Sequence, residues 1–149
     1  MLDRFKTFTL LVTNINRSIR KIKTEEMAEY NLKSIHISCL YFLYKSEKLT
    51  AKELCDICDE DKAAMSRSID YLEKNDFIKC DSNAKKRYNA SFYLTEKGIK
   101  ISKLICEKID KILNKASETL SEENRQILYK SLSLINDNLQ KICNDYEEK

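Results

Sequence analysis

Two long stretches, one near each end of the chain, carry apolar residues at alternating steps of three and four. The first stripe consists of Phe5, Phe8, Val12, Ile15, Ile19 and Ile22. The second consists of Leu128, Leu132, Ile135, Leu139, Ile142 and Tyr146. This spacing places the apolar residues on one face of a helix. We therefore predict long amphipathic helices over about residues 3–29 and 121–146, the second with Ser121 as its N-cap.

Two helix-capping signals lie close together in the middle of the chain. Thr50 and Glu53 have the spacing of a capping box. Asp61 precedes another amphipathic segment and is its expected N-cap. Two short helices that begin in this way and are joined by a tight turn predict a helix-turn-helix over about residues 50–74. The preceding segment 32–45 is apolar on most sides, which predicts a buried central helix.

Strand-like sequence follows the predicted helix-turn-helix. Residues 77–80 and 90–94 are short strand-like runs separated by a polar, basic stretch. A hairpin at this place is a wing, which we predict over about residues 77–94. Thr95 is then a candidate N-cap for a further long helix. The predicted fold class is mainly α with a small β-hairpin wing, in a single domain over residues 1–149.

Composition narrows the functional classes. Hydrophobic residues make up 42% and charged residues 34% of the 149 residues, which is typical of a soluble, helix-rich globular protein. No apolar run approaches the roughly 20 residues that cross a bilayer, and the N-terminal segment is too interrupted by charge to be a signal peptide. We therefore expect no membrane partner and a cytoplasmic location.

The scarcity of three residue types argues against an enzyme. The chain has no proline and one glycine, Gly98, so a glycine-rich phosphate loop is absent from the sequence. A single histidine, His36, leaves little material for a nucleophile activated by histidine. We predict no catalytic residues and no cofactor.

The six cysteines are expected to be free thiols, because a chain without an export signal stays in a reducing compartment. Cys55 and Cys58 have the C-x-x-C spacing of redox and metal sites. One such pair without a second pair or a nearby histidine is a weak zinc signal. We therefore predict buried structural thiols and no metal site, and a redox- or metal-sensing use of the cysteines stays an alternative.

The segment from Leu49 to Ile78 resembles the helix-turn-helix of the MarR family of transcriptional regulators. The similarity is carried by the pairs Glu53 and Leu54, Ser66 and Arg67, and Leu72 and Glu73, and by the wing exit Leu94, Thr95, Glu96, Lys97 and Gly98. Asp59 and Asp76 stand where related proteins often have glycine, and aspartate tolerates the left-handed backbone better than most residues. The order of the predicted helices also agrees with the family over nearly the whole chain.

The predicted second helix of the helix-turn-helix has a buried face with Met65, Ile69 and Leu72. This arrangement turns another set of residues outward as the candidate DNA-binding surface: Lys62, Ala63, Ser66, Arg67, Asp70 and Tyr71. An arginine on such a helix can read guanine in the major groove, and the alternative is an ordinary solvated face. Lys85, Lys86 and Arg87 concentrate positive charge at the wing tip, where they can enter the minor groove. In the family pattern an arginine stands one position further on, where this chain has Tyr88.

The resemblance implies a sequence-specific DNA-binding regulator, expected to be a repressor released by a small-molecule effector. The two apolar stripes predict a homodimer, whose two-fold symmetry requires a pseudo-palindromic site on double-stranded DNA. Candidate effector-binding residues near the implied pocket are Arg17, His36, Tyr41 and Tyr44. The alternatives are the cysteine-based sensor and a winged-helix protein-interaction module without DNA.

Overall fold

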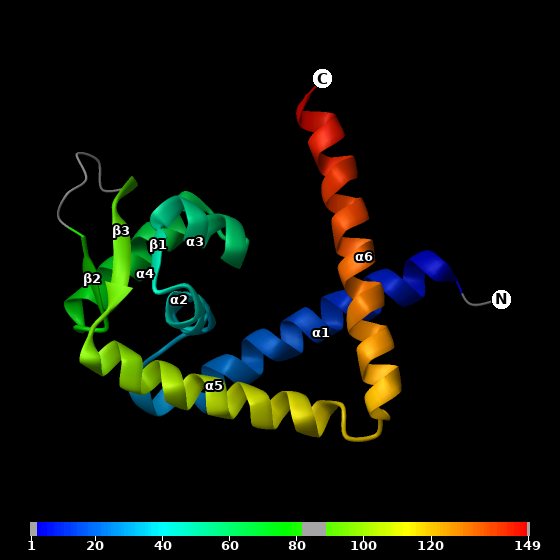
Figure 1. The fold of residues 1–149 in the computed structure, drawn as a ribbon, viewed down its shortest axis with the longest axis horizontal. Coiled ribbons are helices and arrows are strands. Elements are labelled where there is room, and N and C mark those ends of the chain that lie inside the picture. Colours follow the sequence, from blue (N-terminus) through cyan, green and yellow to red (C-terminus); the bar gives the residue numbers. More distant parts are fainter. Residues whose placement is uncertain (1–2, 82–88, 149) are drawn as a thin grey trace. The chain divides into compact units, whose positions relative to one another are not determined.

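The computed structural model describes residues 3–81 and 89–148. The chain divides into two compact units, residues 1–109 and 110–149. The first unit contains the helix-turn-helix, the strands and most of the long helix that follows them (Figure 1). The prediction of one domain over residues 1–149 stays a prediction.

The helices of the first unit follow the predicted order. They are α1 (Arg4–Glu26), the short 3-10 helix η1 (Ala28–Tyr30), α2 (Ser34–Ser46), α3 (Ala51–Cys58), α4 (Lys62–Lys74) and α5 (Glu96–Ala116), which continues into the second unit. The first helix was predicted to extend to about residue 29, but α1 ends at Glu26, because the backbone beyond it forms the tighter helix η1. A left-handed Asn31, with φ of 55°, then ends η1.

Among the described residues, three short strands form one antiparallel sheet: β1 (Lys48–Thr50), β2 (Ile78–Cys80) and β3 (Ser91–Leu94). Their order is β1-β3-β2, so the last strand in sequence lies between the other two (Figure 1). Leu49 and Cys80 both pair with Phe92. The two wing strands were predicted from the sequence, whereas β1 was not. The mainly helical fold class with a small wing is confirmed.

The core of the first unit forms around α2, as the apolar segment 32–45 predicts. Leu40, Leu43 and Phe92 are fully buried, and α2 packs against α1, α3, α4, β1 and β3. The Ser102 hydroxyl of α5 donates a hydrogen bond of 3.3 Å to the Leu40 carbonyl. Burial of large apolar side chains is the main stabilising contribution, at about 25 cal/mol per Å² of apolar surface, so α2 holds the helix-turn-helix in place.

Two aspartates adopt the left-handed backbone conformation. This agrees with the expectation from the sequence, since related proteins often have glycine at both positions. Asp59, with φ of 51°, ends α3, and Asp76, with φ of 60°, lies between α4 and β2. The Asp59 N–H donates to the Cys55 carbonyl, which satisfies a group that the end of α3 leaves free. These tight turns set the directions in which α4 and β2 begin.

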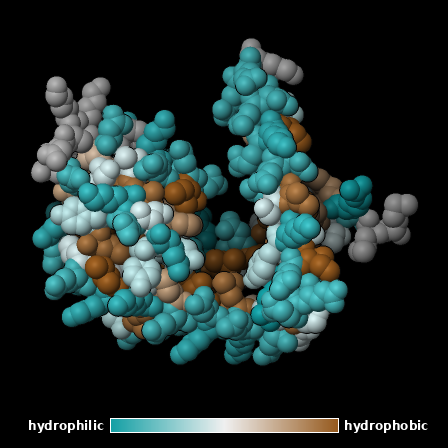
Figure 2. All heavy atoms as spheres, viewed as in Figure 1, coloured by the Kyte–Doolittle hydropathy of each residue, from teal (hydrophilic) through white to brown (hydrophobic). Residues whose placement is uncertain are grey.

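The second unit contains the end of α5 and α6 (Glu122–Glu147). The Ser121 hydroxyl accepts a hydrogen bond of 3.2 Å from the Asn124 N–H, which confirms the predicted N-cap. Neither α6 nor α1 has a buried residue. The apolar stripes of both helices are exposed, and apolar patches interrupt the hydrophilic surface of α6 in Figure 2. Within the described part of the chain, no helix combines the length and apolar character needed to cross a membrane.

Candidate nucleic-acid interface

The start of α3 is fixed by the predicted capping box. The Thr50 hydroxyl accepts from the Glu53 N–H at 3.2 Å, and the Glu53 carboxylate accepts from the Thr50 N–H at 2.7 Å. Hydrogen bonds from the Thr50 backbone and hydroxyl lower the pKa of Glu53, because they favour the charged carboxylate. The capping box therefore satisfies two backbone donors and fixes the entry of the chain into the helix-turn-helix.

The second helix, α4, begins at the predicted cap and buries the predicted face. Asp61 Oδ1 accepts from the Ala64 N–H at 2.7 Å. Met65, Ile69 and Leu72 are buried against the core. The opposite face carries the exposed residues Lys62, Ala63, Ser66, Arg67 and Asp70. This exposed face of α4 combines two cations, a hydroxyl and a small residue that permits close approach to a surface.

Tyr71 does not share this exposed face, contrary to the sequence-based prediction. Its side chain is half-buried, and its hydroxyl donates to the Asn31 carbonyl at 2.7 Å. The ring stacks on His36 of α2, with centroids 4.4 Å apart. Helical spacing alone predicted that Tyr71 points outward. In the structure, its long side chain reaches from the end of α4 to the segment that connects α1 with α2.

His36 is one of three polar side chains buried in the described core. Its Nδ1 accepts from the Lys33 N–H at 3.1 Å and so closes the start of α2. Desolvation by burial, followed by the nearby positive charge of Lys33, lowers the pKa of His36 to about 4. His36 is therefore neutral near pH 7 and joins α2 to α4 through the Tyr71 ring.

The described part of the wing carries an exposed lysine. Lys79 of β2 is exposed and stands opposite Tyr93. Lys48 of β1 forms an ion pair of 3.2 Å with Asp81, just beyond β2. The predicted basic tip, Lys85, Lys86 and Arg87, lies outside the described residues.

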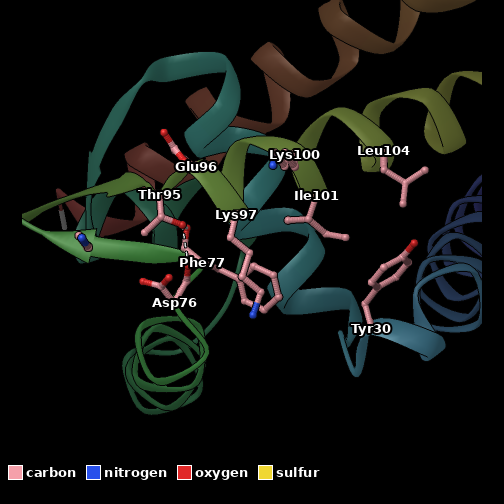
Figure 3. Close-up of a pocket in the computed structure, with 10 residues that line it drawn as sticks. Tyr30, Asp76, Phe77, Thr95, Glu96, Lys97, Lys100, Ile101 and Leu104 are labelled. Atoms are coloured by element: carbon pink, nitrogen blue, oxygen red, sulfur yellow. Dashed lines mark hydrogen bonds between the residues drawn. The ribbon is translucent and has the colours of Figure 1, made fainter.

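The exit from the wing brings two backbones into close contact. The Thr95 hydroxyl donates at 2.5 Å to the Asp76 carbonyl and accepts at 3.0 Å from the Gly98 N–H, so it caps α5 as predicted. A Cβ atom at position 98 would lie 2.0 Å from the Phe77 carbonyl oxygen. Glycine is therefore required for α5 to pack against the segment that leads into β2. Figure 3 draws the hydrogen bonds that join Thr95 to Asp76 and Phe77.

Comparison with known proteins agrees with this geometry. A family model described as the MarR family matches residues 30–87, the segment that holds α2, the helix-turn-helix and the first wing strand. Over this segment the chain is similar to the MarR family. A search of curated protein sequences gave no match.

Solved structures of MarR-family proteins share the fold over most of the chain. A Listeria monocytogenes protein of the family, solved in complex with 26mer DNA, is 26% identical, with a TM-score of 0.79 over 86% of this chain and 85% of that chain. A MarR regulator from Methanosarcina mazei is 20% identical, with a TM-score of 0.83 over 92% of this chain and 99% of that one. The S. aureus MepR–DNA complex is 18% identical, with a TM-score of 0.75 over 92% and 99%.

The four candidate effector residues have different surroundings. Arg17 is exposed on α1, whereas His36 is buried and engaged as described above. Tyr41 and Tyr44 are half-buried, and the Lys45 ammonium lies 5.6 and 5.9 Å from their ring centroids. Their predicted role in effector binding stays a prediction.

A cavity of 810 Å³ lies elsewhere in the first unit, beside the start of α5, and is lined by none of these four residues. Lys79, Lys97 and Lys100 supply positive charge to its wall. The Lys97 ammonium donates to the Asn75 carbonyl at 2.7 Å and lies 4.3 Å from the Phe77 ring centroid. Figure 3 shows Ile101, Leu104 and Tyr30 on the apolar side of the cavity. Sequence reasoning missed this site, because its lining comes from three separated segments.

The six cysteines all lie within the described residues, form no disulfide there and differ in exposure. Cys55 is buried, as predicted, and Cys58 is half-buried. Cys143 is exposed on α6, where the sequence analysis expected a packed thiol. The described residues contain no group of three or more histidine, cysteine or acidic side chains arranged to hold a metal ion.

Proposed function

We propose that this chain binds double-stranded DNA as a homodimer and regulates transcription, without catalytic activity of its own. The exposed face of α4 is the main support for the proposal, because it presents Arg67 and Lys62 to solvent. The N-cap of α4 and its buried face against the core hold this helix in place. An α-helix fits the major groove of B-form DNA, where arginine pairs with guanine and hydroxyls contact phosphate. The DNA complexes of the Listeria and S. aureus proteins support this use of the fold.

The exposed apolar stripes support the homodimer. On α6, Leu132 and Leu139 are 43% and 49% exposed, and on α1, Val12 and Ile15 are 45% and 57% exposed. Soluble proteins rarely leave such continuous apolar faces in water. A second copy of the chain offers matching stripes, and the two-fold symmetry of a dimer would present two α4 helices to a pseudo-palindromic operator.

The cavity beside α5 supports a small-molecule effector, and we propose that the regulator is a repressor released by it. Three lysines against the two carboxylates of Asp76 and Glu96 leave the lining with a small positive charge. Together with an aromatic ring and apolar side chains, this charge suits an organic anion with an apolar body. Titration of the protein with salicylate as a probe anion, followed by isothermal calorimetry, tests this site. Lys100→Ala should weaken binding, whereas Lys103→Ala, an exposed change on the same helix, should not.

The central experiment is selection of bound fragments from the source genome, followed by titration of the selected operator. Arg67→Ala should weaken operator binding, with discrimination at one position of each half-site reduced by about 1–3 kcal/mol if the side chain reads a base. Lys74→Ala, which removes an exposed cation in the last turn of the same helix, is the matched control and should bind as the unmodified chain does.

The salt dependence of DNA affinity distinguishes the contribution of the wing from that of α4. Removal of Lys85, Lys86 and Arg87 together should lower affinity for all sequences and flatten the dependence of log affinity on log salt, because fewer counterions are released. Unchanged binding and salt slopes in this variant and in Arg67→Ala would refute the proposed surface. Failure to bind any duplex at low salt would instead favour a protein-interaction module.

A further inference from the structure

The start of α5 donates hydrogen bonds to three consecutive backbone carbonyls at the end of α4. The Lys97 ammonium donates at 2.7 Å to the carbonyl of Asn75, the residue that caps the C-terminus of α4. The Thr95 hydroxyl donates to the Asp76 carbonyl, and the Thr95 N–H donates to the Phe77 carbonyl at 3.0 Å. The turn over residues 75–77 is therefore bound directly to α5.

The N–H groups of the same turn are bound to α4. The Asn75 N–H donates to the Tyr71 carbonyl at 3.1 Å. The next two N–H groups, of residues 76 and 77, donate to the carbonyls of residues 73 and 72 at 3.0 and 2.9 Å. The turn thus lies between the two helices, with its donors on α4 and its acceptors on α5. Because β2 begins directly after it, this turn fixes the direction of β2 relative to α4.

Lys97 is the only cation among the groups of α5 that hold this turn in the described structure. The last carbonyls of a helix carry partial negative charge and have no partner within the helix, so a cation stabilises them. The Lys97 ammonium also lies 4.3 Å from the Phe77 ring centroid, a cation–π distance (Figure 3). Its side chain is exposed, so a substitution can remove both contacts without opening the core.

We propose that Lys97 is a positioning residue for DNA binding, which holds α4 and the wing in the relative orientation that DNA requires and does so through Asn75 and Phe77. The inference rests on the proposed function, since it takes the exposed face of α4 as the DNA-binding surface. Arg67 precedes the turn on α4 by about two helical turns, and the wing follows it.

The two DNA-contacting elements are thus joined by the turn that Lys97 holds. If the turn loosens, α4 and β2 can change their relative angle, and one of them no longer fits its groove. Apparent affinity then falls in proportion to the fraction of molecules that keep the binding orientation.

Titration of the selected operator with Lys97→Met tests the inference, because methionine keeps an apolar side chain of similar length and removes the charge. We expect binding to weaken by about three- to tenfold. The slope of log affinity against log salt should stay the same, because no phosphate contact is lost. Lys97→Arg should restore most of the affinity, since a guanidinium can donate to the same carbonyl and stack on Phe77. Lys103→Met removes an exposed cation from the same helix and should bind as the unmodified chain does.

Hydrogen exchange in the absence of DNA locates the effect. The amides of residues 75–77 should exchange about threefold faster or more in Lys97→Met, and at the unmodified rate in Lys103→Met, because opening of the turn breaks their bonds to α4. Circular dichroism and urea unfolding verify that each variant is folded. If Lys97→Met does not fold, Lys97→Gln replaces it.

The outcomes separate positioning from two other roles of Lys97. Lower stability with unchanged operator affinity would show a structural contact only and overturn the inference. A salt slope reduced by about one would show a direct phosphate contact and also overturn it. Equal affinity in Lys97→Met and the unmodified chain would overturn the inference and leave the proposed function intact. Absence of duplex binding by the unmodified chain would overturn both.

Discussion

The imidazole of His36 and the phenol ring of Tyr71 lie nearly parallel, with centroids 4.4 Å apart and an interplanar angle of 9°. His36 belongs to the central helix α2, and Tyr71 to α4, whose opposite face is the proposed DNA-binding surface. The Tyr71 hydroxyl extends the link by its hydrogen bond to the Asn31 carbonyl. The stack therefore connects the helix that carries Arg67 to the core and to the segment that follows α1.

This stack predicts a loss of stability on acidification. His36 has a pKa of about 4 in the folded chain, against 6.5 for an unperturbed histidine. Between these values the unfolded chain binds a proton that the folded chain does not, so the free energy of unfolding falls as pH decreases from 6.5 towards 4. Above pH 6.5 His36 is neutral in both states and contributes no pH dependence.

Urea denaturation at pH 7.5 and pH 5 measures this effect. His36→Gln removes the titration and should reduce the difference in unfolding free energy between the two pH values, although the substitution itself lowers stability at pH 7.5 because the stack is lost. Lys33→Met, which removes the nearby charge, should also reduce the acid sensitivity. An acid sensitivity equal in the unmodified chain and in His36→Gln would contradict the assignment.

The close approach at Gly98 predicts a strong sensitivity to any side chain. Gly98→Ala would place a Cβ atom 2.0 Å from the Phe77 carbonyl oxygen, so α5 or β2 must shift. Overpacking of this kind costs about 1–3 kcal/mol of unfolding free energy. Lys103→Ala, at an exposed position of the same helix, should change stability by about 0.5 kcal/mol or less. Thermal and urea unfolding compare the two variants, and equal stabilities would argue against this packing.

The N-cap of α4 predicts a separate effect on stability. Asp61→Ala removes the acceptor for the Ala64 N–H and should cost about 1 kcal/mol of unfolding free energy. Asp61→Asn keeps a capping oxygen and should restore most of this loss, whereas Asp56→Ala, an exposed change on α3, is the control for lost charge. Urea unfolding gives the stabilities. If Asp61→Ala and Asp61→Asn are equally destabilised, the cap is not the cause.

The apolar stripe of α6 predicts dimerisation through this helix. Replacement of both Leu132 and Leu139 by glutamate should dissociate the dimer, because buried carboxylates without partners are strongly unfavourable. The double variant Lys130→Glu and Asn144→Glu places two carboxylates away from the stripe and should remain dimeric. Sedimentation at micromolar concentration distinguishes these outcomes, and circular dichroism separates dissociation from unfolding. A monomeric unmodified chain would refute the proposed homodimer.

Sequence by itself determined the features that depend on local backbone chemistry. The capping box of Thr50 and Glu53, the cap at Asp61 and the left-handed Asp59 each involve groups within a few residues of one another. Helical periodicity also gave the buried face of α4 and the apolar stripe of α6, because side-chain direction repeats every 3.6 residues. These signals placed nearly all the helices and both strands of the wing.

Only the tertiary structure decided which distant residues meet. β1 escaped prediction because three residues carry too little pattern, and its stability comes from pairing with β3, more than forty positions away. Tyr71 turned inward because Asn31 and His36, from other segments, offer its hydroxyl and ring their partners. Such contacts form because the core brings separate elements together, and no local pattern records them.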